Sequence, residues 1–215
     1  KIFDSLSWTA DGQATGDGET PYSTTGLVAQ WNFNETSGTT ASVAAGSCGA
    51  TCNGTLTNFT DTSGQDVAAG SGWSADNRRW GAGALMFDGS NDAVLVSDNN
   101  ALDIASNLTI EAWIKPAGGT NQSIVSKRDV SANEANYSLR IDDGNAAELD
   151  FFYSYSGAWQ IYTTTNANLV PGKWTHIAVT HDGSSVQIYK NGRLLNGSCT
   201  TGSCNMAMTP ENNSL

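Results

Sequence analysis

The segment from Trp174 to Leu195, WTHIAVTHDGSSVQIYKNGRLL, constrains the fold more than any other part of the chain. It predicts two alternating strands, an Asp-Gly turn, a third strand, an Asn-Gly turn and a fourth strand. The dipeptides Asp182-Gly183 and Asn191-Gly192 are typical of tight hairpins, because type I′ turns need positive φ at both central residues. Between them, Val186–Lys190 alternates with the period of two that a half-buried strand requires. The segment therefore predicts an antiparallel meander.

Four upstream segments also show short alternating strand patterns divided by turn residues, and none contains a long run of apolar residues at helical period. They are FDGSNDAVLV (87–96), LTIEAWIKP (108–116), YSLRIDDGNAAELDFFY (137–153) and WQIYTTT (159–165). Short strands divided by Gly, Asn, Asp and Ser favour an all-β fold, an antiparallel β-sandwich, over a parallel α/β sheet. Three tryptophans in alternating runs are predicted to be buried, namely Trp31, Trp113 and Trp174.

The chain divides into a weakly patterned start and one patterned domain. Residues 1–25 predict a lead-in or linker, and residues 26–215 predict a single β-sandwich domain. Within that domain, the turn-rich segment 34–77 is either a functional loop or a decorated connection, and the sequence leaves both open.

Charge excludes several classes of partner. The chain has 10 basic and 21 acidic residues, which gives a formal charge of −11. Binding to nucleic acid or to an anionic membrane would need a positively charged patch on the protein surface, so neither is expected to bind. No apolar run approaches the roughly 20 residues that span a bilayer, so membrane insertion is not expected either. Cations and neutral polar ligands remain open.

The four cysteines form two close pairs in small-residue loops, and they are Cys48, Cys52, Cys199 and Cys204. Zinc binding is the alternative to disulfides, but zinc sites usually have tighter C-x-x-C knuckles, and no histidine lies near either pair. Three disulfide connectivities are possible, and proximity favours the two local ones. Disulfides indicate an oxidising compartment, and eight Asn-x-Ser/Thr sequons fit export too, so we expect an extracellular or cell-surface protein.

The order of several motifs resembles one known superfamily. GLVAQWNFNETSG, NGTLTN, WGAGALMFDGSNDAVLVSDNNALDIASNLTIEAWIKP, SIVSKRDVSANEANYSLRID and LVPGKWTHIAVTHDGSSVQIYKNGRLL follow one another between about Gly26 and Leu195. This series resembles the laminin-G-like, concanavalin A-like jelly-roll superfamily, which includes the pentraxins. The resemblance implies two stacked antiparallel sheets, a non-enzymatic role in most members, glycan or protein binding, and often a Ca²⁺ ion at the rim. Function still depends on the site, because one fold hosts many functions.

Family members usually continue with further strands beyond the KNGRLL hairpin. Here the resemblance ends at Leu195, and the last 20 residues show no strong alternating strand. We therefore expect an open sheet edge that further sequence or a strand from a partner chain completes, because unpaired edges invite strand addition.

Calcium is the cofactor that the acidic turns suggest, because it prefers carboxylate, amide and carbonyl oxygens. Asp88, Asn91 and Asp92 lie together in the FDGSND turn, and Glu134 and Asn136 lie where the pentraxins, by resemblance, contribute ligands. The alternative is that these residues only shape turns through hydrogen bonds to their own backbone.

Catalysis has little support in the sequence. ELDFFY places Glu148 and Asp150 on one strand face and resembles the E-x-D-x-x-E signature of laminarinase-like glucanases, but the third carboxylate position holds Tyr153. A glycosidase needs two carboxyl groups at a set separation, so no catalytic residue is assigned. His176 and His181 fall on opposite faces of a strand and are expected to be structural.

Aromatic residues around the Ser-Gly-Ala turn are the candidate ligand contacts, since exposed rings stack on sugars. They are Tyr153, Tyr155, Trp159 and Tyr162. The sequence therefore predicts non-catalytic extracellular recognition of a carbohydrate or surface glycoprotein, with Ca²⁺ as the candidate cofactor. The alternatives are a structural or adhesive subunit of a cell-surface appendage and an accessory domain of a secreted glycoside hydrolase.

Overall fold

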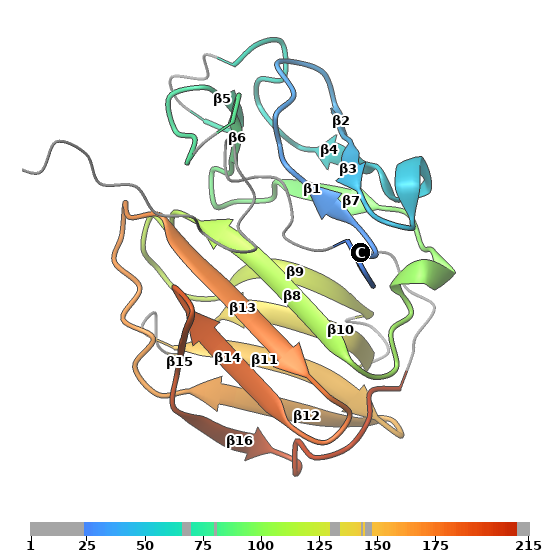
Figure 1. Ribbon diagram of the computed structural model, residues 1–215. Coiled ribbons are helices and arrows are strands. Elements are labelled where there is room, and N and C mark those ends of the chain that lie inside the picture. Colours follow the sequence, from blue (N-terminus) through green and yellow to red (C-terminus); the bar gives the residue numbers. More distant parts are fainter. Residues whose placement is uncertain are drawn as a thin grey trace, which may run out of the picture.

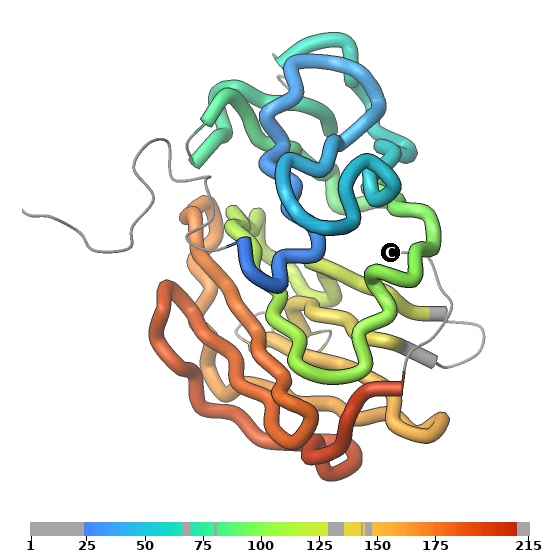
Figure 2. Tube along the Cα trace, turned by 45° about the vertical axis from the view of Figure 1, so that its right-hand side comes forward, coloured from blue at the N-terminus to red at the C-terminus, as the bar shows by residue number. Residues whose placement is uncertain are grey.

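The computed structural model describes residues 24–65, 70–79, 81–129, 134–142, 144 and 148–209. Two antiparallel sheets form a sandwich, and a smaller unit from the N-terminal part of the chain lies at one end of it (Figures 1 and 2). This arrangement confirms the all-β, antiparallel sandwich. Residues 1–23, most of the predicted lead-in, lie outside the described residues. No helix among the described residues is long and apolar enough to cross a bilayer.

The larger sheet has five strands. In spatial order they are β16 (Gly197–Thr201), β12 (Ala158–Thr164), β11 (Leu149–Tyr155), β10 (Glu134–Ile141) and β9 (Gln122–Asp129). The β9–β10 pairing shifts register twice, between Ala135 and Tyr137 and between Leu139 and Arg140. Such bulges twist a strand locally and redirect its side chains.

The second sheet has four strands, ordered β15 (Arg193–Leu194), β14 (Val186–Lys190), β13 (Thr175–His181) and β8 (Leu108–Ile114). The predicted meander is confirmed, but the segment before the Asp-Gly turn forms one strand rather than two, because no turn residue interrupts Thr175–His181. Asn191 and Gly192 have φ values of 50° and 75°, as a type I′ turn requires.

The Asp182-Gly183 turn differs from the prediction. Gly183 has a φ of 87°, whereas the φ of Asp182 is not positive. A type I′ turn needs positive φ at both residues, so this turn is of another type. The Asp182 carboxylate instead accepts hydrogen bonds from the backbone and hydroxyl groups of Ser184 and Ser185. The backbone hydrogen bond to Ser184, followed by the other bonds, lowers the pKa of Asp182 far below its usual value.

The N-terminal unit is built from short strands and two 3₁₀ turns. Its elements are β1 (Gln30–Trp31), β2 (Thr40–Ala41), β3 (Val43–Ala45), η1 (Gly49–Cys52), β4 (Gly54–Thr57), β5 (Gly72–Ser74), β6 (Ala84–Met86), β7 (Ala93–Val96) and η2 (Asn100–Leu102). Trp73 is fully buried there, and its indole N–H donates to the Gly38 carbonyl at 2.7 Å. The segment 34–77 is therefore largely part of this packed unit.

The main core lies between the two sheets. Leu139, Leu149 and Phe151 from the larger sheet and Ile177 and Ile188 from the smaller one are fully buried in it. His181 also lies there, 4.7 Å from the Tyr153 ring centre, and burial lowers the pKa of His181. His176 contacts Trp113 on the opposite face, so the two histidines lie on opposite faces of the strand, as the sequence predicts.

The tryptophans are less buried than predicted. Trp113 keeps 38% of its surface exposed, because the alternation of β8 that buries Ile110 in the core turns Trp113 outward with Glu111. Trp31 and Trp174 are partly buried. Trp73, the most buried tryptophan among the described residues, lies in a segment with weak alternation, so its burial had no clear sequence signal.

Both local disulfides are confirmed. Cys48 pairs with Cys52 and Cys199 with Cys204, with Cα separations of 5.8 and 5.7 Å. Each closes a short loop, which is worth about 2 kcal/mol on the chain-entropy model.

The C-terminal segment adds a strand that the sequence did not predict. Strand β16 pairs with β12, and beyond it Cys204 and Met208 pack into the main core. The Thr209 N–H donates to the Ser154 carbonyl at 2.8 Å, which holds the segment against β11. The edge at β12 is therefore covered by the chain itself. The larger sheet now ends at β16 and β9 and the smaller one at β15 and β8, and a segment that covers any of these edges stays a prediction.

Candidate functional site

The outward face of the five-stranded sheet carries the candidate site. Strand alternation puts Phe151 in the core and turns Phe152 away from it. The pairing registers place other side chains on the same outward face, and these are Ser138, Arg140, Asp150, Ser154, Trp159, Ile161 and Thr163. Three neighbouring strands thus present aromatic, hydroxyl and charged groups together.

Two aromatic rings and one guanidinium group pack together at the middle of this face. The Phe152 and Trp159 ring centres are 6.0 Å apart with their planes at 87°, which is the favourable edge-to-face geometry. The Arg140 guanidinium lies 4.3 Å from the centre of the Phe152 ring, as in a cation–π contact. Phe152 is only 7% exposed, whereas Trp159 is partly exposed. Phe152 therefore supports the Trp159 ring, which is the one that a ligand can reach.

A polar network continues from Arg140 across the face. Arg140 donates from Nε and Nη2 to one Asp150 carboxylate oxygen at 3.3 and 3.2 Å, and the Thr163 hydroxyl donates to the other at 2.7 Å. Asp150 is 3% exposed, and this burial raises its pKa although the hydrogen bonds from Thr163 and Arg140 oppose the rise. The network fixes the Arg140 side chain, because charge-assisted bonds of this kind are strong and directional.

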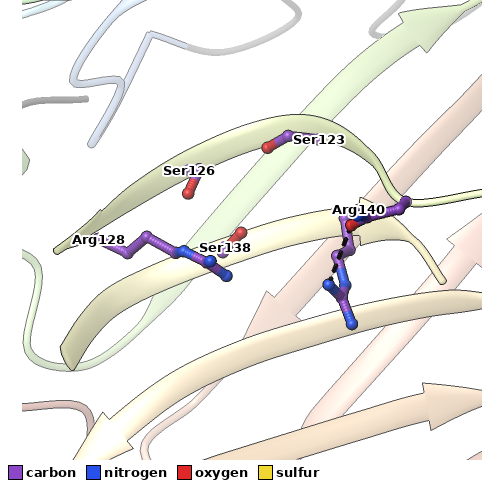
Figure 3. A pocket seen from close by; sticks show the side chains of 6 residues that line it. Ser123, Ser126, Arg128, Ser138 and Arg140 are labelled. Atoms are coloured by element: carbon purple, nitrogen blue, oxygen red, sulfur yellow. Dashed lines mark hydrogen bonds between the residues drawn. The ribbon is translucent and has the colours of Figure 1, made fainter. Parts of the chain in front are cut away.

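A hollow of about 210 Å³ lies beside this network on β9 and β10. Six side chains line it, namely Asn121, Ser123, Ser126, Arg128, Ser138 and Arg140. Figure 3 shows Arg128 and Arg140 at opposite ends of the hollow, with the serines between them. Ser138 is only 2% exposed, and Arg140 Nη1 donates to Asn121 Oδ1 at 3.3 Å. All six lining residues therefore have polar side chains, which can form several hydrogen bonds with a ligand.

The four predicted aromatic residues do not lie together. Tyr153 is fully buried in the main core, because it alternates with Phe152 on β11, so its prediction as a ligand contact is wrong. Tyr162 pairs with Phe151 and packs against the same core. Tyr155 is 39% exposed at the end of β11. It lies two residues after Tyr153, so its side chain is on the same face of the sheet as Tyr153 and not on the outward face. Trp159 is the predicted residue that lies on the outward face.

Sequence reasoning missed Phe152, Arg140 and Arg128. The alternation of FFY could have identified Phe152, because if Phe151 faces the core then its neighbour faces outward. The two arginines carried no such signal, since they lie on strands whose register shifts at bulges. The carboxylate Asp150 was noted only as half of an incomplete catalytic pair, and its partners are Arg140 and Thr163 instead.

The predicted calcium ligands divide into two places. Asp88, Asn91 and Asp92 share one turn, where Asp88 accepts from the Ser90 N–H and Asp92 accepts from the Ser71 hydroxyl and the Asp88 N–H. Asn136 on β10 is fully buried, and the Glu134 side chain lies outside the described residues. Among the residues described, no group of three or more His, Cys, Asp and Glu side chains is placed to hold a metal.

Calcium binding at the Asp88–Asp92 turn stays a prediction with a direct test. A ligand that binds only the folded state stabilises it by linkage, by about 2.7 kcal/mol at a concentration of 100 times its Kd. The melting temperature should therefore rise in millimolar Ca²⁺, return to its original value with a chelator, and lose this response in Asp92→Ala. An unchanged melting temperature would leave turn formation as the role of these residues.

Comparison with known proteins agrees with this architecture. A family model described as the concanavalin A-like lectin/glucanases superfamily matches residues 88–213, more than half of the chain. The resemblance therefore extends beyond Leu195, where we expected it to end. No curated protein matches the chain.

One similar solved structure is domain 4 of AbnA, a GH43 extracellular arabinanase from Geobacillus stearothermophilus, in complex with arabinotriose. It is 22% identical in sequence with a TM-score of 0.56, over 87% of this chain and 81% of that one. At this identity the likeness concerns the fold alone. With the stacked antiparallel sheets and the family match, it leads to one assignment: this chain belongs to the concanavalin A-like lectin/glucanases superfamily.

Proposed function

We propose that this chain is a non-catalytic, extracellular carbohydrate-binding module whose ligand lies across the outward face of the five-stranded sheet. The observation that carries the proposal is the partly exposed Trp159 ring, held edge-to-face by Phe152, whose own ring also contacts the Arg140 guanidinium of the Arg140–Asp150 pair. Sugars present apolar ring faces rimmed by hydroxyl groups, so an aromatic ring beside fixed donors and acceptors matches their chemistry.

Two further findings support the proposal. The similar domain of AbnA was solved with arabinotriose, which is consistent with a glycan ligand on this fold. The two disulfides fit an oxidising, extracellular environment. Since that domain belongs to an extracellular glycoside hydrolase, an accessory domain of a secreted polysaccharide-degrading enzyme is the second candidate, ahead of a subunit of a cell-surface appendage.

Replacing Trp159 with alanine should weaken glycan binding by about tenfold to a hundredfold. Loss of a central aromatic contact typically costs about 1.4 to 2.8 kcal/mol of binding free energy. Retention on immobilised polysaccharides that include arabinan, followed by titration calorimetry with oligosaccharides of the retained glycan, measures the change.

The matched control is Tyr189→Ala, which removes a partly exposed aromatic ring from β14 in the other sheet. It should leave glycan affinity unchanged. Failure of the unmodified chain to bind any polysaccharide, or equal losses in the two variants, would contradict the proposal.

A further inference from the structure

We infer that the hollow on β9 and β10 selects an acidic glycan by binding one anionic group, a carboxylate or a sulfate, between Arg128 and Arg140. This inference rests on the proposed function and goes beyond it by naming the class of ligand. It depends on the charges and the free hydrogen-bonding groups of the hollow.

The lining of the hollow is positive in a chain that is otherwise strongly acidic. Two arginines and no carboxylate belong to its six lining residues, whereas the whole chain has 21 acidic and 10 basic side chains. Asp150 neutralises Arg140 from the neighbouring strand, and Arg128 has no hydrogen bond or ion pair with any described residue. The hollow thus carries about one positive charge that lacks a counter-charge from these residues.

The neutral groups of the hollow point to the same ligand chemistry. Ser138 is 2% exposed and lines the hollow, yet its hydroxyl makes no hydrogen bond with a described residue. The Ser138 hydroxyl oxygen is not among the fully buried unpaired atoms of the described residues, so it opens onto the hollow, where it can donate a hydrogen bond to an occupant. Carboxylate and sulfate oxygens accept from hydroxyl groups and from the fork of an arginine at the same time.

The position of the hollow connects it to the sugar-binding face. Arg140 lines the hollow and also contacts the Phe152 ring, which in turn packs against Trp159. A polysaccharide lying over Trp159 can therefore place an acidic substituent of a neighbouring sugar unit in the hollow. Because the chain has a net charge of −11, a polyanion gains nothing from non-specific attraction, and binding of one would require a local positive site.

The test measures the affinity of the whole 215-residue chain for matched charged and neutral glycans. Oligogalacturonate is compared with its methyl ester, which keeps the sugar ring but removes the charge, and a sulfated galactan is compared with its desulfated form. We expect a charged ligand to bind at least about tenfold more tightly than its neutral counterpart, the size of one charge-assisted hydrogen bond. A preference in the first pair identifies the anion as carboxylate, and a preference in the second identifies it as sulfate.

Variants then connect that preference to Arg128. Arg128→Gln should abolish the preference, and Arg128→Lys should keep part of it, because lysine retains the charge but not the planar fork. Arg193→Gln makes the same charge change on the exposed strand β15 and should leave it intact. Equal affinity for charged and neutral glycans, or a preference unaffected by Arg128→Gln, would overturn the inference while the glycan-binding function remains. Absence of binding to every glycan would overturn both.

Discussion

Replacing Lys127 with methionine is expected to lower the free energy of unfolding by about 3 kcal/mol. The Lys127 side chain is fully buried, and its Nζ lies 2.9 Å from both Asp98 Oδ1 and Asp103 Oδ1. The contact with Asp98 is also a directed hydrogen bond, whereas that with Asp103 is an ion pair only. Removing one partner of a buried ion pair costs about 3 to 5 kcal/mol, because it leaves charge without compensation.

We expect the lower end of that range because the two carboxylates keep 30% and 21% of their side-chain surface exposed. For a chain of this length the loss corresponds to a fall in melting temperature of roughly 6 to 12 °C. Thermal unfolding of Lys127→Met beside Lys115→Met is the measurement. Lys115 is exposed and donates one hydrogen bond to Asn77, so its variant should change stability by less than about 0.5 kcal/mol.

Lys127 has this effect because it joins two parts of the fold. It lies on β9 of the large sheet, whereas Asp98 and Asp103 lie in the segment between β7 and β8, which links the N-terminal unit to the sandwich. Lys127→Met combined with Asp98→Asn should recover part of the lost stability, since the double variant leaves less uncompensated charge. Equal stability of Lys127→Met and the unmodified chain would show that the ion pairs contribute nothing.

Local pattern predicted the elements of this fold well. The alternating segments became β8 and β10 to β14, and the Asn-Gly hairpin has the expected turn, because period and turn chemistry depend on neighbouring residues alone. Cys48 and Cys52 are likewise close enough in sequence for proximity to predict their bond.

Contacts between residues that lie far apart in the sequence could not be predicted from local pattern. Nothing in the sequence SKRDV distinguishes the buried Lys127 from an exposed lysine, because its partners lie more than twenty residues away. The hollow depends in the same way on the bulged register between β9 and β10, which brings Ser126 opposite Ser138 and Ser123 opposite Arg140. Alternation could predict which residues each strand turns outward. It could not predict which of those residues lie next to one another and form a site.

Substituting each of two adjacent phenylalanines on β11 should separate stability from binding. Phe151 is fully buried in the main core, so Phe151→Ala should cost about 3 to 5 kcal/mol of unfolding free energy through lost burial and the cavity left behind. Phe152 lies on the other face, where it holds the Trp159 ring and the Arg140 guanidinium. Phe152→Ala should therefore cost less stability, about 2 kcal/mol, because it loses the burial of one ring but leaves no closed cavity in the core.

The two variants should rank in the opposite order for glycan binding. Phe152→Ala removes the ring that holds Trp159 in place. We expect about a tenfold loss of affinity, because ligand binding must then order the Trp159 side chain, which costs conformational entropy. Phe151→Ala, measured well below its melting temperature, should bind normally, and Phe151→Leu, which keeps most of the volume, gives a second variant of the core position. Urea unfolding and titration calorimetry on the same samples supply both quantities. A loss of affinity in the Phe151 variants equal to that in Phe152→Ala would mean that binding follows overall stability rather than the outward face.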